Sequence, residues 1–206
     1  MTQPPVTPPA EGGPRPMPVQ LDLDAPLEVA RWRPLVHWIL AIPHALILYV
    51  LGAVSGILTF IAFFAILFTK RFPRGMFDFV VMTQRYQWRV ATYYLFMRES
   101  YPPFDFEARA DDNGNDPARL SIEYPEELSR WLPLVKWLLA FPHYFVMILL
   151  VIGFFFAWIA AFFAVLFTGR YPEGIRNYAI GVARWQTRVQ AYVRLLRDEY
   201  PPFSLT

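Results

Sequence analysis

The sequence predicts a mainly α-helical membrane protein built from one unit used twice, and three observations predict this class. The 206 residues are 55% hydrophobic and 18% aromatic, with a mean hydropathy of +0.28, which exceeds the usual range of soluble domains. Two long apolar runs, 34–68 and 133–167, contain a single lysine and no arginine or carboxylate. The stretches that begin at Arg31 and Arg130 repeat the same motifs at a constant offset.

The duplication extends over most of the chain. RWRPLVHWILAIPH matches RWLPLVKWLLAFPH, and ILFTKRFPRG and RESYPPFDF match VLFTGRYPEG and RDEYPPFSL without a gap. A repeat of this length is one structural unit used twice. We therefore divide the chain into a disordered Pro-rich tail without a secretory signal (1–18), repeat 1 (19–107), a linker (108–117) and repeat 2 (118–206).

Each repeat is expected to begin with a short strand. VQLDLDAP from Val19 and ARLSIEYP from Ala118 alternate apolar and polar residues, which is the period of a half-buried strand. We expect short strands of both copies to form a small sheet. Phe104–Glu107 and Arg119–Tyr124 are expected to pair as a hairpin across the linker.

The linker between the repeats resembles a calcium loop only in part. Asp111, Asn113 and Asn115 stand at alternate positions. An EF-hand loop needs glycine next, and the chain has Asp116 there with no glutamate at the required distance. No metal site is therefore expected in the linker.

The apolar runs allow two topologies. A helix of 34 residues would be about 50 Å long, too long for one upright span of the hydrocarbon core. Each run is then either a shallow helical hairpin, with its tip at 52–56 in the first copy, or a short segment followed by one long span from Pro43 or Pro142. Lysine and arginine are not depleted on either side of the runs, which favours hairpins with every basic segment in the cytoplasm.

An amphipathic helix is expected after each apolar run, at 75–98 and 174–197. Apolar residues recur there with 3-4 spacing, which predicts one helical stripe. This stripe lies either in the membrane interface or against the stripe of the other copy. A membrane-crossing return helix is disfavoured because its arginines would reach the middle of the bilayer. The stripes are Met76, Phe79, Thr83, Tyr86, Val90, Tyr93 and Met97, and Ile175, Tyr178, Val182, Trp185, Val189, Tyr192 and Leu196.

Basic and aromatic residues on and near these helices predict contacts with anionic lipid headgroups. Arginine binds phosphate, and tryptophan is enriched at the level of the headgroups. The candidate lipid-binding residues are Arg85, Arg89, Arg184, Arg188, Trp32, Trp131 and Trp185.

A Pro-His pair recurs inside each apolar run, as Pro43-His44 and Pro142-His143. Proline leaves a helical carbonyl without its donor, and a polar neighbour helps to satisfy the backbone there. The alternative is that the two histidines ligate a shared haem. The candidate polar or cofactor site comprises His44, His143, Asp78 and Asn177, the last two lying one heptad before the arginine pairs.

No catalytic set is present in the sequence. It contains no cysteine and three histidines, and it lacks HExxH, GxSxG, Walker and GxGxxG motifs. The net charge of +2 gives no reason to expect nucleic acid as a partner. We therefore expect a protein that is not an enzyme and that needs no cofactor unless the haem alternative holds.

The paired motifs RWxPLVxWxLAxPH, FTxR[FY]PxG and YPPF resemble those of an uncharacterised family of bacterial membrane proteins, catalogued only as a domain of unknown function. The resemblance covers nearly everything after the Pro-rich tail. It implies a bacterial membrane location and assigns no activity and no functional residues.

The expected function follows from the layout, which is similar to that of reticulon-type membrane-shaping proteins without sharing a motif with them. We expect a multi-pass protein of the bacterial cell membrane whose soluble segments are cytoplasmic. It would organise the membrane or scaffold a complex. Its partners would be anionic lipids and other membrane proteins or further copies of itself. A cofactor-bearing or transport subunit is the alternative.

Overall fold

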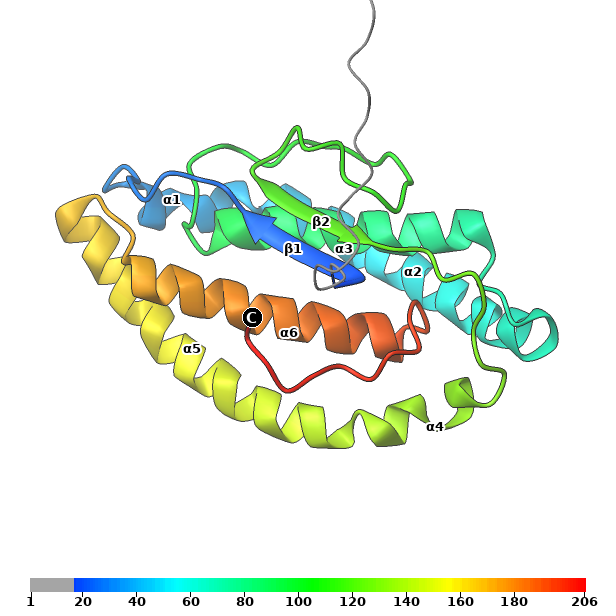
Figure 1. The fold of residues 1–206 in the computed structure, drawn as a ribbon. Helices are drawn as coiled ribbons and strands as arrows, with labels where there is room; N and C mark the ends of the chain where they lie inside the picture. The colour runs from blue at the N-terminus through cyan, green and yellow to red at the C-terminus, as the bar shows by residue number, and fades with distance from the viewer. Residues whose placement is uncertain (1–16) are drawn as a thin grey trace, which may run out of the picture.

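The computed structural model describes residues 17–206, so the Pro-rich segment 1–16 lies outside the described residues. The described chain is mainly helical and repeats one order of elements twice: a strand, a short helix, a long apolar helix and an amphipathic helix (Figure 1). The elements are β1 (Val19–Leu23), α1 (Arg33–Leu40), α2 (Ile42–Thr69), α3 (Arg74–Tyr94), β2 (Ala118–Ile122), α4 (Leu132–Leu139), α5 (Phe141–Thr168) and α6 (Glu173–Val193).

The two strands form one antiparallel sheet that joins the repeats, as the sequence predicted. Leu21 of β1 stands opposite Leu120 of β2, and these residues are equivalent at the repeat offset of 99 (120 − 21). The predicted hairpin of Phe104–Glu107 was wrong, because β2 pairs with β1 and residues 104–107 form no strand. Phe104 instead stacks on His44.

Each apolar run is one bent helix pair and not a hairpin. Residues 52–56, the predicted tip, lie inside the continuous 28-residue helix α2. The chain bends at Ala41, between α1 and α2, where Pro43 occupies the first turn of the new helix. A continuous helix keeps every backbone group of 52–56 hydrogen-bonded within an apolar segment, whereas an open turn there would leave several unpaired.

The amphipathic helices α3 and α6 end at Tyr94 and Val193, four residues before the predicted ends. Phe96 (φ 51°) and Leu195 (φ 66°) adopt the left-handed conformation just beyond them, which stops a right-handed helix.

The predicted stripes of α3 and α6 lie mainly against their own apolar helix. α3 packs on α2 and β2, and α6 packs on α5 and β1. Thr83 of α3 accepts a hydrogen bond from Ser55 of α2, and Tyr178 of α6 donates one to the carbonyl of Leu150 in α5. The stripes are therefore not free to lie in a membrane interface, nor do they pack against each other. Each amphipathic helix also contacts the strand of the other repeat.

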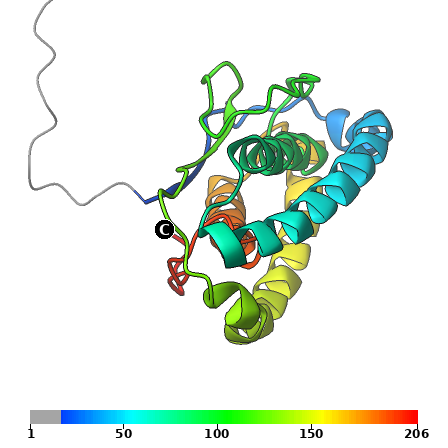
Figure 2. The ribbon, with the colours of Figure 1, turned by 90° about the vertical axis from the view of Figure 1, so that its right-hand side faces the viewer.

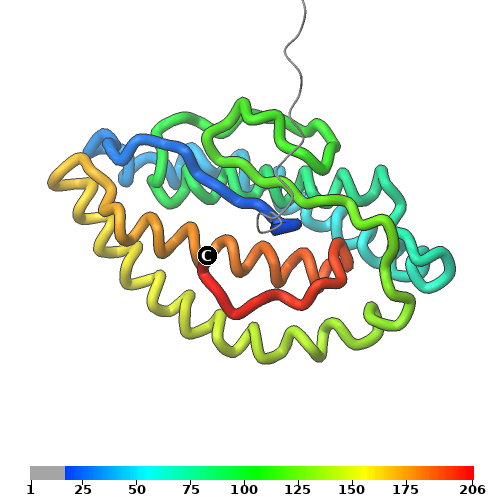
Figure 3. Tube along the Cα trace, in the orientation of Figure 1, coloured from blue at the N-terminus to red at the C-terminus, as the bar shows by residue number. Residues whose placement is uncertain are grey.

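Three layers are visible when the molecule is viewed from one end (Figure 2). The strands and the linker loop form one layer, α3 and α6 form the middle layer, and α2 and α5 with α1 and α4 lie on the opposite side. The C-terminal segment turns back along α6 (Figure 3), where Arg188 donates hydrogen bonds to the carbonyls of Ser204 and Thr206. The layering gives the molecule two dissimilar faces.

Candidate functional site

Two of the predicted lipid-binding arginines are buried under the linker loop. Arg85 and Arg89 are only 2% and 1% exposed. Asp112 forms an ion pair with each of them: its carboxylate oxygens lie 3.2 Å from Arg85 Nε and 3.2 Å from an Arg89 guanidinium nitrogen. Asp105 lies 2.9 Å from Arg89, and Asp116 lies 2.6 Å from Arg98. The acidic linker therefore folds onto repeat 1 as a set of buried ion pairs.

The electrostatics of this cluster follow from its burial. Burial lowers the pKa of Arg85 from its ordinary value, and the Asp112 carboxylate opposes that shift. The hydrogen bond from Arg89 lowers the pKa of Asp105, and partial burial opposes this.

Lipid contact by Arg85 and Arg89 is a prediction that the structure corrects, because carboxylates and backbone carbonyls already occupy their guanidinium groups. Arg188 is also buried, and Trp185, at 4% exposed, donates its indole N–H to His143. Arg184 is partly exposed but lies on the sheet side, 2.6 Å from Asp22. The periodicity of the helices located these residues and could not show which face the linker covers.

Arg85 and Arg184 instead connect the two repeats. Arg85 Nε donates to the carbonyl of Leu120 in repeat 2, at 3.0 Å, and Arg184 Nε donates to that of Leu21 in repeat 1, at 2.9 Å. Each amphipathic helix thus holds the strand of the other copy at the central pair of the sheet. These two equivalent arginines therefore join repeat 1 and repeat 2 through hydrogen bonds to the sheet.

The Pro-His histidine of repeat 1 organises a cluster of aromatic rings. Tyr86 lies with its hydroxyl 2.5 Å from His44 Nδ1, within hydrogen-bond distance, and burial raises the pKa of Tyr86 to about 12, so the phenol stays protonated. His44 also stacks on Phe104, with ring centroids 4.7 Å apart and planes at 12°, and contacts Tyr101. The YPPF motif thus covers the Pro-His motif.

The second histidine repeats this arrangement with different donors. Trp185 Nε1 donates to His143 Nδ1 at 3.1 Å, while Phe203 stacks on the imidazole at 4.1 Å and Tyr200 contacts its edge. No aromatic residue is shared with the cluster around His44.

These residues do not fit a shared haem. Each histidine lies in its own aromatic cluster, with a phenylalanine ring stacked on its face. Asp78 pairs with Arg74 one turn away, and Asn177 is exposed on α6, so neither joins a histidine. Within residues 17–206, no group of three or more histidines and carboxylates is arranged to hold a metal ion.

The opposite side of the molecule is a large apolar surface. α2 and the continuous α4–α5 segment are long and apolar enough to cross a membrane. Their exposed residues form a broad face along α2 and cover most of the circumference of α5. They include Leu46, Tyr49, Ile57, Phe60, Phe64 and Phe68 on α2, and Phe141, Phe145, Ile148, Ile152, Phe156, Phe163 and Phe167 on α5.

Basic residues and tryptophans mark both ends of this apolar surface. Trp32 and Trp131 are exposed, and their contact with lipid stays a prediction. Each follows an exposed arginine, and a second exposed arginine follows each long helix. We call the two groups the basic corners: Arg31, Trp32 and Arg170 at one end, and Lys70, Arg71, Arg130 and Trp131 at the other.

The basic corners are formed by both repeats. Val29 donates its backbone N–H to Gly169, and Leu128 donates to Lys70, so the start of each apolar run meets the end of the other. The motif FTxR[FY]PxG and the RW pair carry these residues, and their recurrence is the sequence signal that could have identified the corners.

Fold and surface together define a two-faced, internally duplicated helical protein, with a charged sheet side and an apolar side bordered by arginine and tryptophan. The chain belongs to the family described as Domain of unknown function (DUF4389), whose model matches residues 31–105 and 130–204. No curated protein and no solved structure matches it.

Proposed function

We propose that this protein is a non-enzymatic membrane protein that lies flat in one leaflet of a bilayer. In this arrangement α1, α2, α4 and α5 lie among acyl chains, and the sheet and linker lie in water. The observation that carries the proposal is the position of charged, exposed groups beside the middle of α3 and α6, on the side opposite the apolar surface.

An upright arrangement conflicts with those charges. α3 follows α2 after a short turn and packs along it, so both helices would cross the bilayer together. Arg85, near the middle of α3, holds the linker at the carbonyl of exposed Asp111, and exposed Glu107 directly precedes the linker. These groups and the sheet would then lie at the middle of the hydrocarbon core, where charge and unpaired backbone are costly.

The flat arrangement also gives the basic corners a role. Arg31 and Arg130 would lie at the level of the headgroups, with Trp32 and Trp131 beside them, where arginine binds phosphate and tryptophan is favoured. α2 is about 42 Å long at 1.5 Å per residue, so two such helices in one leaflet would displace many lipids. We infer that the protein organises the membrane, or anchors a complex to it, by this one-sided insertion.

Vesicle insertion tests this proposal. Detergent-solubilised protein is diluted into phosphatidylcholine vesicles with or without phosphatidylglycerol, and the protein that floats with the vesicles is measured. The double variant R31Q/R130Q should reduce flotation with anionic vesicles. R119Q, which changes an exposed arginine of β2 on the sheet side, should not.

Equal losses for R31Q/R130Q and R119Q would contradict a specific role for the basic corners. Soluble dimers without vesicle insertion would show that a second copy covers the apolar surface. A cofactor-bearing or transport subunit is not favoured, because His44 and His143 belong to separate aromatic clusters.

A further inference from the structure

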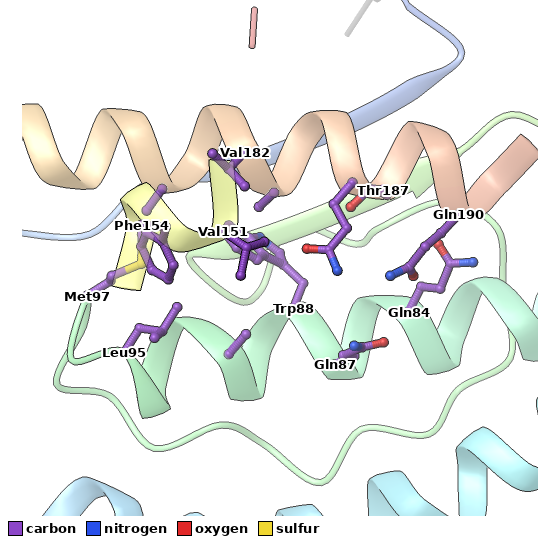
Figure 4. Close-up of a pocket in the computed structure, with 14 residues that line it drawn as sticks. Gln84, Gln87, Trp88, Leu95, Met97, Val151, Phe154, Val182, Thr187 and Gln190 are labelled. Carbon is purple, nitrogen blue, oxygen red and sulfur yellow. The ribbon is translucent and has the colours of Figure 1, made fainter. Parts of the chain in front are cut away.

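A cavity of about 300 Å³ lies between α3 and α6, where the two repeats meet (Figure 4). Glutamines and a threonine gather at one end, and Leu95, Met97 and Phe154 line the other. Its volume is at the lower end of the range for small-molecule sites. None of the fourteen residues that line it is charged.

Gln84 is the reason to regard this cavity as a binding site. Its side chain belongs to a residue that is only 3% exposed, and neither its amide nitrogen nor its amide oxygen has a hydrogen-bond partner within residues 17–206. A buried amide without partners is costly. Gln87, Gln190 and Thr187 line the same end of the cavity, so donors and acceptors converge there.

The chemistry of the lining selects the ligand. An amide offers both a donor and an acceptor, so a hydroxyl or an ester beside a hydroxyl satisfies it, whereas a ligand with acceptors alone does not. A phosphate or carboxylate would enter without a cation to pair with, because no lysine or arginine lines the cavity. The ligand head should therefore be polar and uncharged.

The apolar end indicates where the rest of the ligand lies. Val151 and Phe154 come from α5, and Val151 is 46% exposed on the apolar surface. The cavity thus borders the surface that we assign to acyl chains. A ligand with a polar head and one apolar chain would place its head at Gln84 and its chain toward Phe154.

We propose that this cavity binds the head of an uncharged glyceride, a monoacylglycerol or a diacylglycerol. The proposal rests on the proposed membrane association only for the supply of ligand, since binding can be measured in micelles. It adds a site for one uncharged lipid to the proposed contacts of the basic corners with anionic headgroups.

Native mass spectrometry of the full chain in dodecyl maltoside tests the site. The probe is 1-monooleoylglycerol, with oleate and oleoyl lysophosphatidylcholine as charged comparators of the same chain length. We expect one bound monooleoylglycerol, with about tenfold weaker binding in Gln84→Met, which removes the amide nitrogen and oxygen at similar volume. Gln20→Met, at an exposed position of β1 outside the cavity, should bind as the wild type does.

A second variant tests the cavity independently of any change of fold that Gln84→Met causes. Ala183→Phe places a ring in the cavity and should abolish binding while circular dichroism remains unchanged. Equal binding of all three lipids, or unchanged binding in both cavity variants, would overturn the proposal and show partition into the apolar surface only. Because micelles impose no orientation, these outcomes are independent of whether the protein lies flat in a bilayer.

Discussion

Replacing Asp112 by asparagine should destabilise the protein strongly, because this carboxylate forms ion pairs with two buried arginines. It lies 3.2 Å from Arg85 Nε and 3.2 Å from Arg89, and both arginines are almost fully buried. Removing one partner of a buried ion pair costs about 3–5 kcal/mol, because the remaining charge stays desolvated. Asp105 and Asp116 still face Arg89, so we expect a loss of about 3 kcal/mol in the free energy of unfolding.

The other repeat provides a matched control. Asp22 pairs with Arg184, the residue equivalent to Arg85, but both side chains of this pair are partly exposed. Asp22→Asn should cost less than about 1 kcal/mol. Urea unfolding in a mild detergent, followed by near-ultraviolet circular dichroism, compares the two variants. If Asp112→Asn loses no more stability than Asp22→Asn, the linker does not hold repeat 1 as we describe.

Three further changes test separate parts of the structure. Gln84→Met should raise the free energy of unfolding of the lipid-free protein by about 1–3 kcal/mol in urea titrations, because the unpartnered buried amide is removed; a loss of stability would contradict this. Because Arg89 lowers the pKa of Asp105, their pairing stabilises the fold above the ordinary carboxyl pKa of about 3.9 and is lost as pH falls below it. Asp105→Asn should therefore flatten the dependence of stability on pH below about pH 4, and an unchanged slope would argue against the pair. Tyr86→Phe should cost about 1–3 kcal/mol in thermal unfolding, because buried His44 Nδ1 loses its hydrogen-bond partner; an unaltered melting temperature would refute that role.

The elements of the fold were largely predictable from local patterns. Alternation located both strands, the absence of charge located the apolar helices, and 3-4 spacing located the amphipathic helices. The topology of the apolar runs was not predictable from local patterns. Residues 52–56 contain glycine and serine, which occur both in turns and in helices. The backbone of a long apolar segment is satisfied only by continuing the helix, and that requirement outweighs local turn preference.

The site was less predictable because the linker supplies long-range partners. Arg85 and Arg184 are equivalent in the repeat, yet the first is buried beneath Asp112 and the second is partly exposed beside Asp22. Sequence spacing places both on one helix face and does not show what covers that face. The YPPF and Pro-His motifs form one structural feature in each repeat, which the sequence did not show because the two motifs lie far apart along the chain.

The depth of α2 in a bilayer tests the central claim most directly. The chain contains no cysteine, so single variants Leu46→Cys, Ile57→Cys and Phe68→Cys, at exposed positions along α2, can each carry a nitroxide label. Electron paramagnetic resonance, with oxygen and a water-soluble nickel complex as relaxants, measures the depth of each label in reconstituted vesicles. A helix that lies flat predicts the same depth at all three positions. A label at Ile57 near the bilayer centre, with Leu46 and Phe68 near opposite surfaces, would contradict the account.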